Sequence, residues 1–252
     1  MPYDITFRIE KVARGNMNTI TQQDREILIP YIAQKQFSVT VEEVNALMKL
    51  IIHLFTETLV LAGYEERAIK ALRTKFRDAG RRSAPWQPTS SRLPGRPQDG
   101  SDGNRQNRWL FPADHKFYAD EITATFVEIK YYLQALSMFN APSIAPEFQN
   151  LFTPWLLENS VIPGAYLDPI QLIHINFIEF ITYPRGIQSG HIFPLDRGGR
   201  HEPTNTFLML AKSNQIQGNQ TMNELIDTLR EIVAKHDEAL ITGSQLEHRI
   251  RQ

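Results

Sequence analysis

The segment around which this chain is organised runs from Gly190 to Asn205 and reads GHIFPLDRGGRHEPTN; a second run, SNQIQGN, occupies residues 213–219. Together they hold an imidazole, a double glycine, a turn asparagine and a second amide within one short stretch. Such a density of polar groups is poor material for a hydrophobic core, because burying them is costly unless each is hydrogen-bonded. The stretch therefore predicts a functional site.

The local order predicted for this segment is strand, loop, strand and helix. Residues 187–194 are short and apolar-rich and end in proline, which predicts a strand with His191 near its end. Gly198-Gly199 permits a tight reversal, since glycine enters positive φ without steric cost. The apolar run 207–210 then predicts the returning strand.

The chemistry of this unit depends on a helix expected directly after the second strand. Ser213 is expected to cap this helix and to put Asn214 in its first turn, facing His191. A neutral imidazole can take a proton from water near pH 7, and an amide oxygen is a hard ligand suited to Mg²⁺. Because a bound cation stabilises charge on a phosphate and its leaving oxygen, the pair predicts phosphodiester hydrolysis.

The pattern G-H-I-x-P-L-x-x-G-G-x-H-x-P-x-N, with S-N-x-x-Q-G-N downstream, resembles the ββα-metal (HNH, His-Me finger) nucleases over roughly residues 185–225. The resemblance implies that His191 is the general base, that Asn205 fixes the loop and the imidazole, and that Asn214 binds the metal. It also implies Mg²⁺ or Mn²⁺ as the cofactor, double-stranded DNA as the substrate, and products with 5′-phosphate and 3′-hydroxyl ends.

One position departs from the commonest form of the family. Many members carry Asp or His directly before the base as a second metal ligand, whereas this chain has Gly190. The Gly-His pair resembles the non-specific nuclease branch, in which one asparagine holds the hydrated metal. Metal binding is therefore expected to depend mainly on Asn214, with Glu179, Asp196 or Glu202 as further candidates.

Four basic residues near the motif are candidates for contact with the substrate. Arg185, Arg197 and Arg200 either bind phosphate or are solvated surface residues, and Arg185 is a candidate for stabilising the transition state. His201 is expected to contact phosphate, to assist the leaving group or to brace the loop.

A second basic region lies upstream. Residues 80–108 are rich in Gly, Pro, Ser and Arg, which predicts a flexible arm or a linker between domains. A basic arm can neutralise phosphates or enter a groove of DNA. Its candidate DNA contacts are Arg81, Arg82, Trp86, Arg92 and Arg96.

Composition sets further bounds. The 252 residues include no cysteine, which excludes disulfides and a Cys-type structural zinc site. The formal net charge of −1 does not by itself favour a nucleic-acid partner. The N-terminus lacks a signal-like pattern and no apolar run approaches membrane-spanning length, so we expect a cytoplasmic protein with no membrane partner.

The fold class predicted is mainly α, with a helical scaffold that carries a small C-terminal ββα motif. Its expected regions are 1–79 (helical), 80–108 (arm or linker), 109–182 (helical) and 183–252 (ββα region with a C-terminal helix). Capped helix starts are predicted at residues 21–24 and 38–43, and at Asp114. In the last helix, the apolar residues expected to face inward are Leu225, Leu229, Ile232 and Val233.

Most of the chain lies outside the motif, and this surplus, together with the basic arm, favours sequence recognition. An HNH type II restriction endonuclease fits best, acting as a twofold homodimer because one such site cuts one strand. The alternatives are a modification-dependent, homing or non-specific HNH nuclease, or an inactive DNA-binding protein with a degenerate ββα fold.

Overall fold

The computed structural model describes residues 3–83 and 105–241, which are mainly helical with two small antiparallel sheets. The helices are α1 (Ile5–Arg14), α2 (Gln22–Ala33), α3 (Val41–Leu61), α4 (Glu66–Gly80), α5 (Glu121–Leu136), α6 (Pro146–Gln149), α7 (Phe177–Thr182), α8 (Ala211–Gln217) and α9 (Met222–Ile241). The strands are β1 (Arg82–Ser83), β2 (Gln106–Asn107), β3 (Ile187–His191) and β4 (Thr206–Leu210). The fold class predicted from the sequence, a mainly α protein with a small β part, is confirmed.

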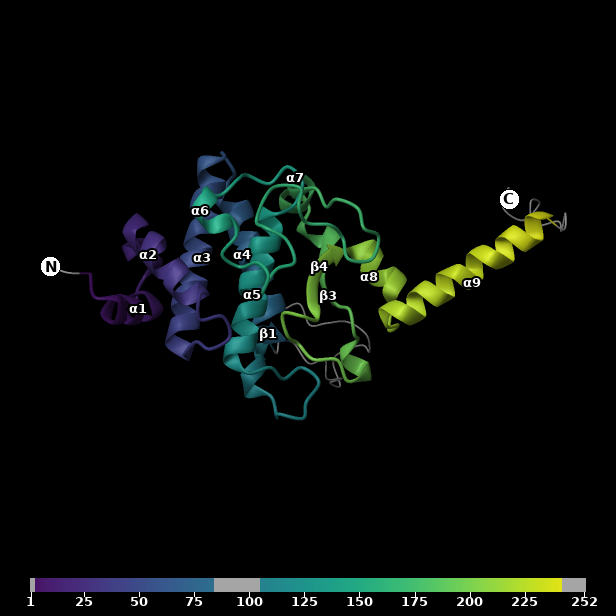
Figure 1. The fold of residues 1–252 in the computed structure, drawn as a ribbon, viewed down its shortest axis with the longest axis horizontal. Coiled ribbons are helices and arrows are strands. Elements are labelled where there is room, and N and C mark those ends of the chain that lie inside the picture. Colours follow the sequence, from purple (N-terminus) through teal and green to yellow (C-terminus); the bar gives the residue numbers. More distant parts are fainter. Residues whose placement is uncertain (1–2, 84–104, 242–252) are drawn as a thin grey trace, which may run out of the picture.

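The core is built around α3 and α5, which pack against each other. Helices α1 and α2 cover α3, while α4 and strand β4 contact α5, an order that Figure 1 shows from left to right. One cluster of buried apolar side chains runs from Ile9 in α1 to Leu208 in β4. The candidate ββα unit is therefore packed directly onto the helical scaffold and shares its core.

The long helix predicted after residues 38–43 is α3, and it corrects the expectation that no apolar segment approaches membrane-spanning length. Its 21 residues would suffice by length and composition to cross a membrane. Eleven of them are buried, and the helix packs against α1, α2 and α5. Packing within the protein accounts for this composition.

Two of the predicted helix starts are confirmed and one is wrong. Thr21 with Asp24, and Thr40 with Glu43, form reciprocal capping boxes at the starts of α2 and α3. Helix α5 begins at Glu121, where the Asp120 carboxylate accepts from the backbone N–H of Thr123 at 2.9 Å. The segment after Asp114 is instead a packed loop, whose Phe117 carbonyl accepts a hydrogen bond from buried Arg108.

The prediction for the last helix is wrong in most of its residues. Leu225 is buried, but Leu229, Ile232 and Val233 are 43%, 48% and 58% exposed. The reason is visible in Figure 1, where α9 projects away from the rest of the molecule as a separate arm. A helical apolar stripe predicts a buried face only where another element of the chain lies alongside it.

The two ends of the predicted basic arm are ordered. Arg82 and Ser83 in β1 pair with Asn107 and Gln106 in β2, and Arg108 after β2 is 6% exposed. Three predicted DNA contacts, Trp86, Arg92 and Arg96, lie outside the described residues.

Candidate active site

The predicted order of strand, loop, strand and helix is present in residues 187–217. Strands β3 and β4 are antiparallel, with Gly190 opposite Phe207 and His191 opposite Thr206. Helix α8 begins directly after β4 and contacts both strands. Ser213 is not its cap, because the helix already begins at Ala211; the buried Ser213 hydroxyl instead donates to Asp168 at 2.8 Å.

The loop between the strands depends on its glycines and on Asn205. Gly198 has φ +90°, and a Cβ on Gly199 would overlap the carbonyl oxygen of Phe193, so neither position tolerates a side chain readily. Asn205 accepts from the Phe193 N–H at 2.7 Å and donates to the carbonyls of Phe193 and Arg200 at 2.9 and 2.8 Å. The Asn205 amide thus ties the two ends of the loop together, and its hydrogen bonds in the described structure go to the loop backbone.

The imidazole of His191 is held by a second histidine. Its Nε2 lies 3.1 Å from Nδ1 of His201, and Nε2 of His201 lies 2.7 Å from the carbonyl oxygen of Gly80 at the end of α4. A carbonyl can only accept, so His201 donates through Nε2 and, when neutral, accepts through Nδ1. His191 must then donate from Nε2, which leaves the Nδ1 lone pair as its proton acceptor.

The electrostatic surroundings keep both histidines neutral. Burial, aided by the Arg108 guanidinium, lowers the pKa of His191 to about 4. The same two causes, together with His191, lower the pKa of His201 well below its usual value. Arg108 is held nearby because its Nε donates to the Gly80 carbonyl at 2.9 Å. The C-terminal end of α4 thus fixes the tautomers of both rings, while burial and Arg108 keep the rings uncharged.

Asn214 contacts the face of β3 that Gln188 and Gly190 share. Its Nδ2 donates to Oε1 of Gln188 at 2.7 Å, which directs its Oδ1 elsewhere. That oxygen would lie 3.2 Å from a Cβ placed on Gly190, and the same Cβ would overlap the Met209 side chain. The glycine at position 190 therefore lets the Met209 side chain pack directly on β3 beside the Asn214 carboxamide.

His191 and Asn214 approach the end of β3 from different sides. Successive side chains along a strand point to opposite faces. Asn214 contacts the face of Gln188 and Gly190, whereas His191 shares its face with Ser189, whose hydroxyl hydrogen-bonds to Tyr131 of α5. Within the described residues no hydrogen bond joins the imidazole to the carboxamide.

The further metal-ligand candidates do not gather around Asn214. Asp196 pairs with Lys116 at 2.5 Å, Glu202 accepts from Thr204 at 3.1 Å, and Glu179 accepts from Asn176 at 3.4 Å. Across residues 3–83 and 105–241, no group of three or more His, Cys, Asp or Glu side chains could hold a metal.

The candidate arginines differ in whether their guanidinium groups are already paired within the protein. Arg81 forms an ion pair with the buried Glu128 at 2.5 Å. Arg82 donates to the Arg105 carbonyl at 2.6 Å. Arg197 makes a two-point contact with Glu224, with one N–O distance of 2.8 Å. Arg185 and Arg200 are exposed.

Arg200 also lines a groove beside the loop. The groove has a volume of about 590 Å³ and contains Lys116, Gly199, Arg200 and the edge of His201. Its lining combines Lys116 and Arg200 with the carboxylates Asp114, Asp120 and Glu202, so its charge alone does not identify it as a site for a phosphate backbone.

Sequence reasoning missed several residues that hold the site together. Gln217 of α8, 2% exposed, donates to the carbonyls of His191 and Ile192 at 2.9 and 3.0 Å. Its presence in the SNQIQGN run was a signal for it. Gly80 and Arg108 are far from the motif in sequence and carry no local signal.

Comparison with known proteins gives little further information. No family model matches the chain, and no curated protein does. A solved structure described as "Crystal structure of a type II restriction endonuclease" aligns with a TM-score of 0.42 and 17% identity, covering 49% of this chain and 55% of that chain. The match thus spans about half the length of that protein. At this level it does not identify a function, which has to be argued from the site.

Proposed function

We propose that this chain is a metal-dependent DNA endonuclease in which His191 is the general base. The observation that carries the proposal is the hydrogen-bonded series from His191 through His201 to the Gly80 carbonyl. It gives a neutral imidazole a defined tautomer at the end of the first strand of a ββα unit. The family pattern in residues 190–219 supplies the reaction class.

In the proposed reaction, Nδ1 of His191 takes a proton from the water that attacks the phosphorus atom. His201 holds the ring by accepting from its Nε2, and Asn205 maintains the loop that carries both histidines. Asn214 is the residue that would hold a hydrated Mg²⁺ or Mn²⁺, because its Nδ2 is engaged by Gln188 while its Oδ1 has no hydrogen-bond partner among the described residues. When bound, such a cation would supply charge stabilisation at the phosphate and the leaving 3′ oxygen.

The proposal extends to sequence specificity. The helical scaffold and the basic residues beyond the motif favour a type II restriction enzyme that acts on double-stranded DNA and leaves 5′-phosphate and 3′-hydroxyl ends. Arg200 and Arg185 are the exposed arginines best placed to contact the backbone. Cleavage of both strands at a palindromic site calls for a twofold homodimer, since each ββα unit cuts one strand.

One observation favours a second candidate, a DNA-binding protein with an inactive ββα fold. His191 and Asn214 approach β3 from opposite faces, and Gly190 supplies no ligand between them. A nuclease requires the substrate phosphate and its metal-bound waters to lie at the end of β3, within reach of both side chains. A binding protein has no such requirement.

Digestion of phage and plasmid DNA with Mg²⁺ or Mn²⁺, beside an EDTA control, tests the proposal. Discrete fragments that disappear with EDTA are expected. A smear would indicate a non-specific nuclease. Binding of DNA without cleavage, with either metal and on both methylated and unmethylated DNA, would favour the inactive DNA-binding protein. The Asn214→Ala variant should raise the metal concentration needed for half-maximal cleavage, whereas Asn219→Ala, an exposed asparagine of the same run, should leave it unchanged.

A further inference from the structure

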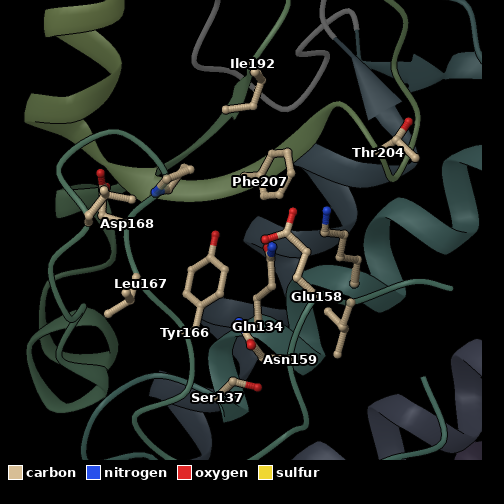
Figure 2. Close-up of a pocket in the computed structure, with 14 residues that line it drawn as sticks. Gln134, Ser137, Glu158, Asn159, Tyr166, Leu167, Asp168, Ile192, Thr204 and Phe207 are labelled. Atoms are coloured by element: carbon tan, nitrogen blue, oxygen red, sulfur yellow. The ribbon is translucent and has the colours of Figure 1, made fainter. Parts of the chain in front are cut away.

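A pocket of about 420 Å³ is lined by residues of α5, of the 157–172 segment and of the β3–β4 hairpin. Its volume is within the range of about 300–1,000 Å³ that is usual for small-molecule sites. Figure 2 shows Gln134, Glu158 and Tyr166 pointing toward the strand that carries Phe207. None of these side chains is used by the proposed cleavage reaction.

The amide of Gln134 is buried and has free donors. Its Oε1 accepts from the Leu208 N–H at 3.1 Å, and the residue is 1% exposed. Because a backbone N–H can only donate, this contact fixes which end of the amide is oxygen. Its Nε2, with two N–H groups, makes no hydrogen bond within the described part of the chain. A donor that opens on a pocket and has no protein acceptor can be satisfied by an acceptor atom of a ligand bound there.

Lys130, one turn before Gln134 on α5, supplies a second set of buried donors. The residue is 4% exposed, and its Nζ donates to the Pro203 carbonyl at 2.5 Å and lies 3.6 Å from the centre of the Phe207 ring. This carbonyl is its one hydrogen-bond partner among the described residues, so donor capacity not directed at the carbonyl or at the Phe207 ring remains available. Burial lowers the pKa of Lys130 to about 7, an effect opposed by Glu158. The donors of Gln134 and Lys130 therefore indicate that a ligand of this pocket carries hydrogen-bond acceptors.

Glu158 provides the complementary acceptors at the mouth of the pocket. It is exposed, as is its neighbour Asn159, and both line the pocket. A carboxylate accepts two parallel hydrogen bonds. Two buried donor side chains and a carboxylate that line the same pocket fit a planar ring with a carbonyl next to two N–H donors. Among the nucleobases, guanine has this edge, with its O6 beside N1–H and the N2 amino group.

We propose that this pocket binds a guanine base, with O6 facing Lys130 and Gln134 and the N1–H and N2 donors facing Glu158. The pocket shares Ile192, Thr204 and Phe207 with the hairpin that carries His191, so a guanine extruded from DNA at the candidate site could reach it. A free guanine nucleotide presents the same edge. Guanine binding here does not require the chain to be a nuclease.

Titration calorimetry of the full chain with GMP, AMP, CMP and UMP tests the proposal. GMP is expected to bind most tightly, and Glu158→Gln should weaken it by about tenfold or more, since a charged hydrogen-bond acceptor is lost. Glu147→Gln, an exposed glutamate on α6, is the matched control and should leave the affinity unchanged. Equal binding of all four nucleotides, no binding of GMP, or an unaltered affinity in Glu158→Gln would overturn the proposal.

A competition experiment distinguishes the two sources of the base. A DNA duplex in which one guanine faces an abasic position lowers the cost of extruding that base. If this duplex displaces GMP more effectively than the fully paired duplex does, guanine enters from DNA. If neither duplex competes while GMP binding persists, the ligand is a free guanine nucleotide. Both results support the guanine chemistry of the pocket, and loss of DNA cleavage in a separate assay would not affect either one.

Discussion

Nε2 of His191 lies 3.1 Å from Nδ1 of His201, and this contact determines which nitrogen of His191 can act as a base. The direction of the hydrogen bond is set one step further away, where His201 donates to the Gly80 carbonyl at 2.7 Å. The end of helix α4 is thereby connected to the proposed reacting atom. The scaffold helices have a chemical role as well as a packing role.

Replacing His201 by Ala should remove the acceptor that fixes the His191 tautomer. Loss of a residue that orients a reacting group typically costs about 10–100-fold in activity, and we expect a fall of that size in cleavage rate with DNA affinity retained. Nitrogen NMR of the histidine rings should show His191 protonated at Nε2 in the wild type and a mixture of tautomers in the variant. His174→Ala, an exposed histidine, serves as the control. An unchanged tautomer in His201→Ala would contradict the assignment.

Gly190→Ala should affect stability and metal dependence together. The added Cβ would overlap the Met209 side chain and lie 3.2 Å from the Asn214 oxygen. Overpacking of this kind costs about 1–3 kcal/mol, which thermal unfolding would detect as a lower midpoint. The displaced carboxamide should also raise the Mg²⁺ concentration required for cleavage. A variant with unaltered unfolding and metal dependence would show that the close packing of Met209 and Asn214 on Gly190 has no role.

The two neutral histidines make stability depend on pH in a defined direction. Burial lowers the pKa of His191 to about 4, below the value of 6.5 expected in the unfolded chain. Between these values the unfolded state binds more protons, so the free energy of unfolding falls as the pH is lowered from 6.5 toward 4 and is fully retained above 6.5. Urea unfolding at pH 7.5, 6 and 5 should show this decline. In His191→Gln the decline should be shallower, and equal slopes in both proteins would argue against a neutral buried imidazole.

Arg81 should contribute to stability more than to DNA binding. It pairs with Glu128, whose side chain is 1% exposed. Removing one partner of a buried ion pair typically costs about 3–5 kcal/mol, because the other charge is left unpaired. Arg81→Ala is therefore expected to lower the unfolding midpoint strongly, and the Arg81→Met, Glu128→Gln double variant should recover part of the loss. If Arg81→Ala weakened DNA binding without destabilising the fold, the arginine would belong to the DNA-binding surface predicted from the sequence.

The local unit was predictable because its signals are local. A strand ended by proline, a double glycine and a second apolar run lie within 25 residues, and β3, the Gly198 turn and β4 occur in that order. The capping boxes at Thr21 and Thr40 were predictable for the same reason. Each of these features depends on residues a few positions apart.

The features that could not be predicted depend on contacts between distant segments. The Gly80 carbonyl accepts from both His201 and Arg108, and Gly80 itself packs so closely on α5 that a Cβ there would overlap the backbone of Glu128. In α9 a contact was predicted that does not form. The spacing of its apolar residues is that of a buried face, although the helix projects from the molecule. A periodic pattern reports a capacity to pack and does not identify the partner.

The central claim is that His191 is the base of a DNA cleavage reaction, and a single-turnover cleavage assay comparing wild type with His191→Ala tests it most directly. DNA affinity and the circular dichroism spectrum of each protein are measured in the same preparation. We predict Mg²⁺- or Mn²⁺-dependent cutting by the wild type, and a variant that folds and binds DNA but does not cut it. Cleavage by His191→Ala at the wild-type rate would contradict the claim.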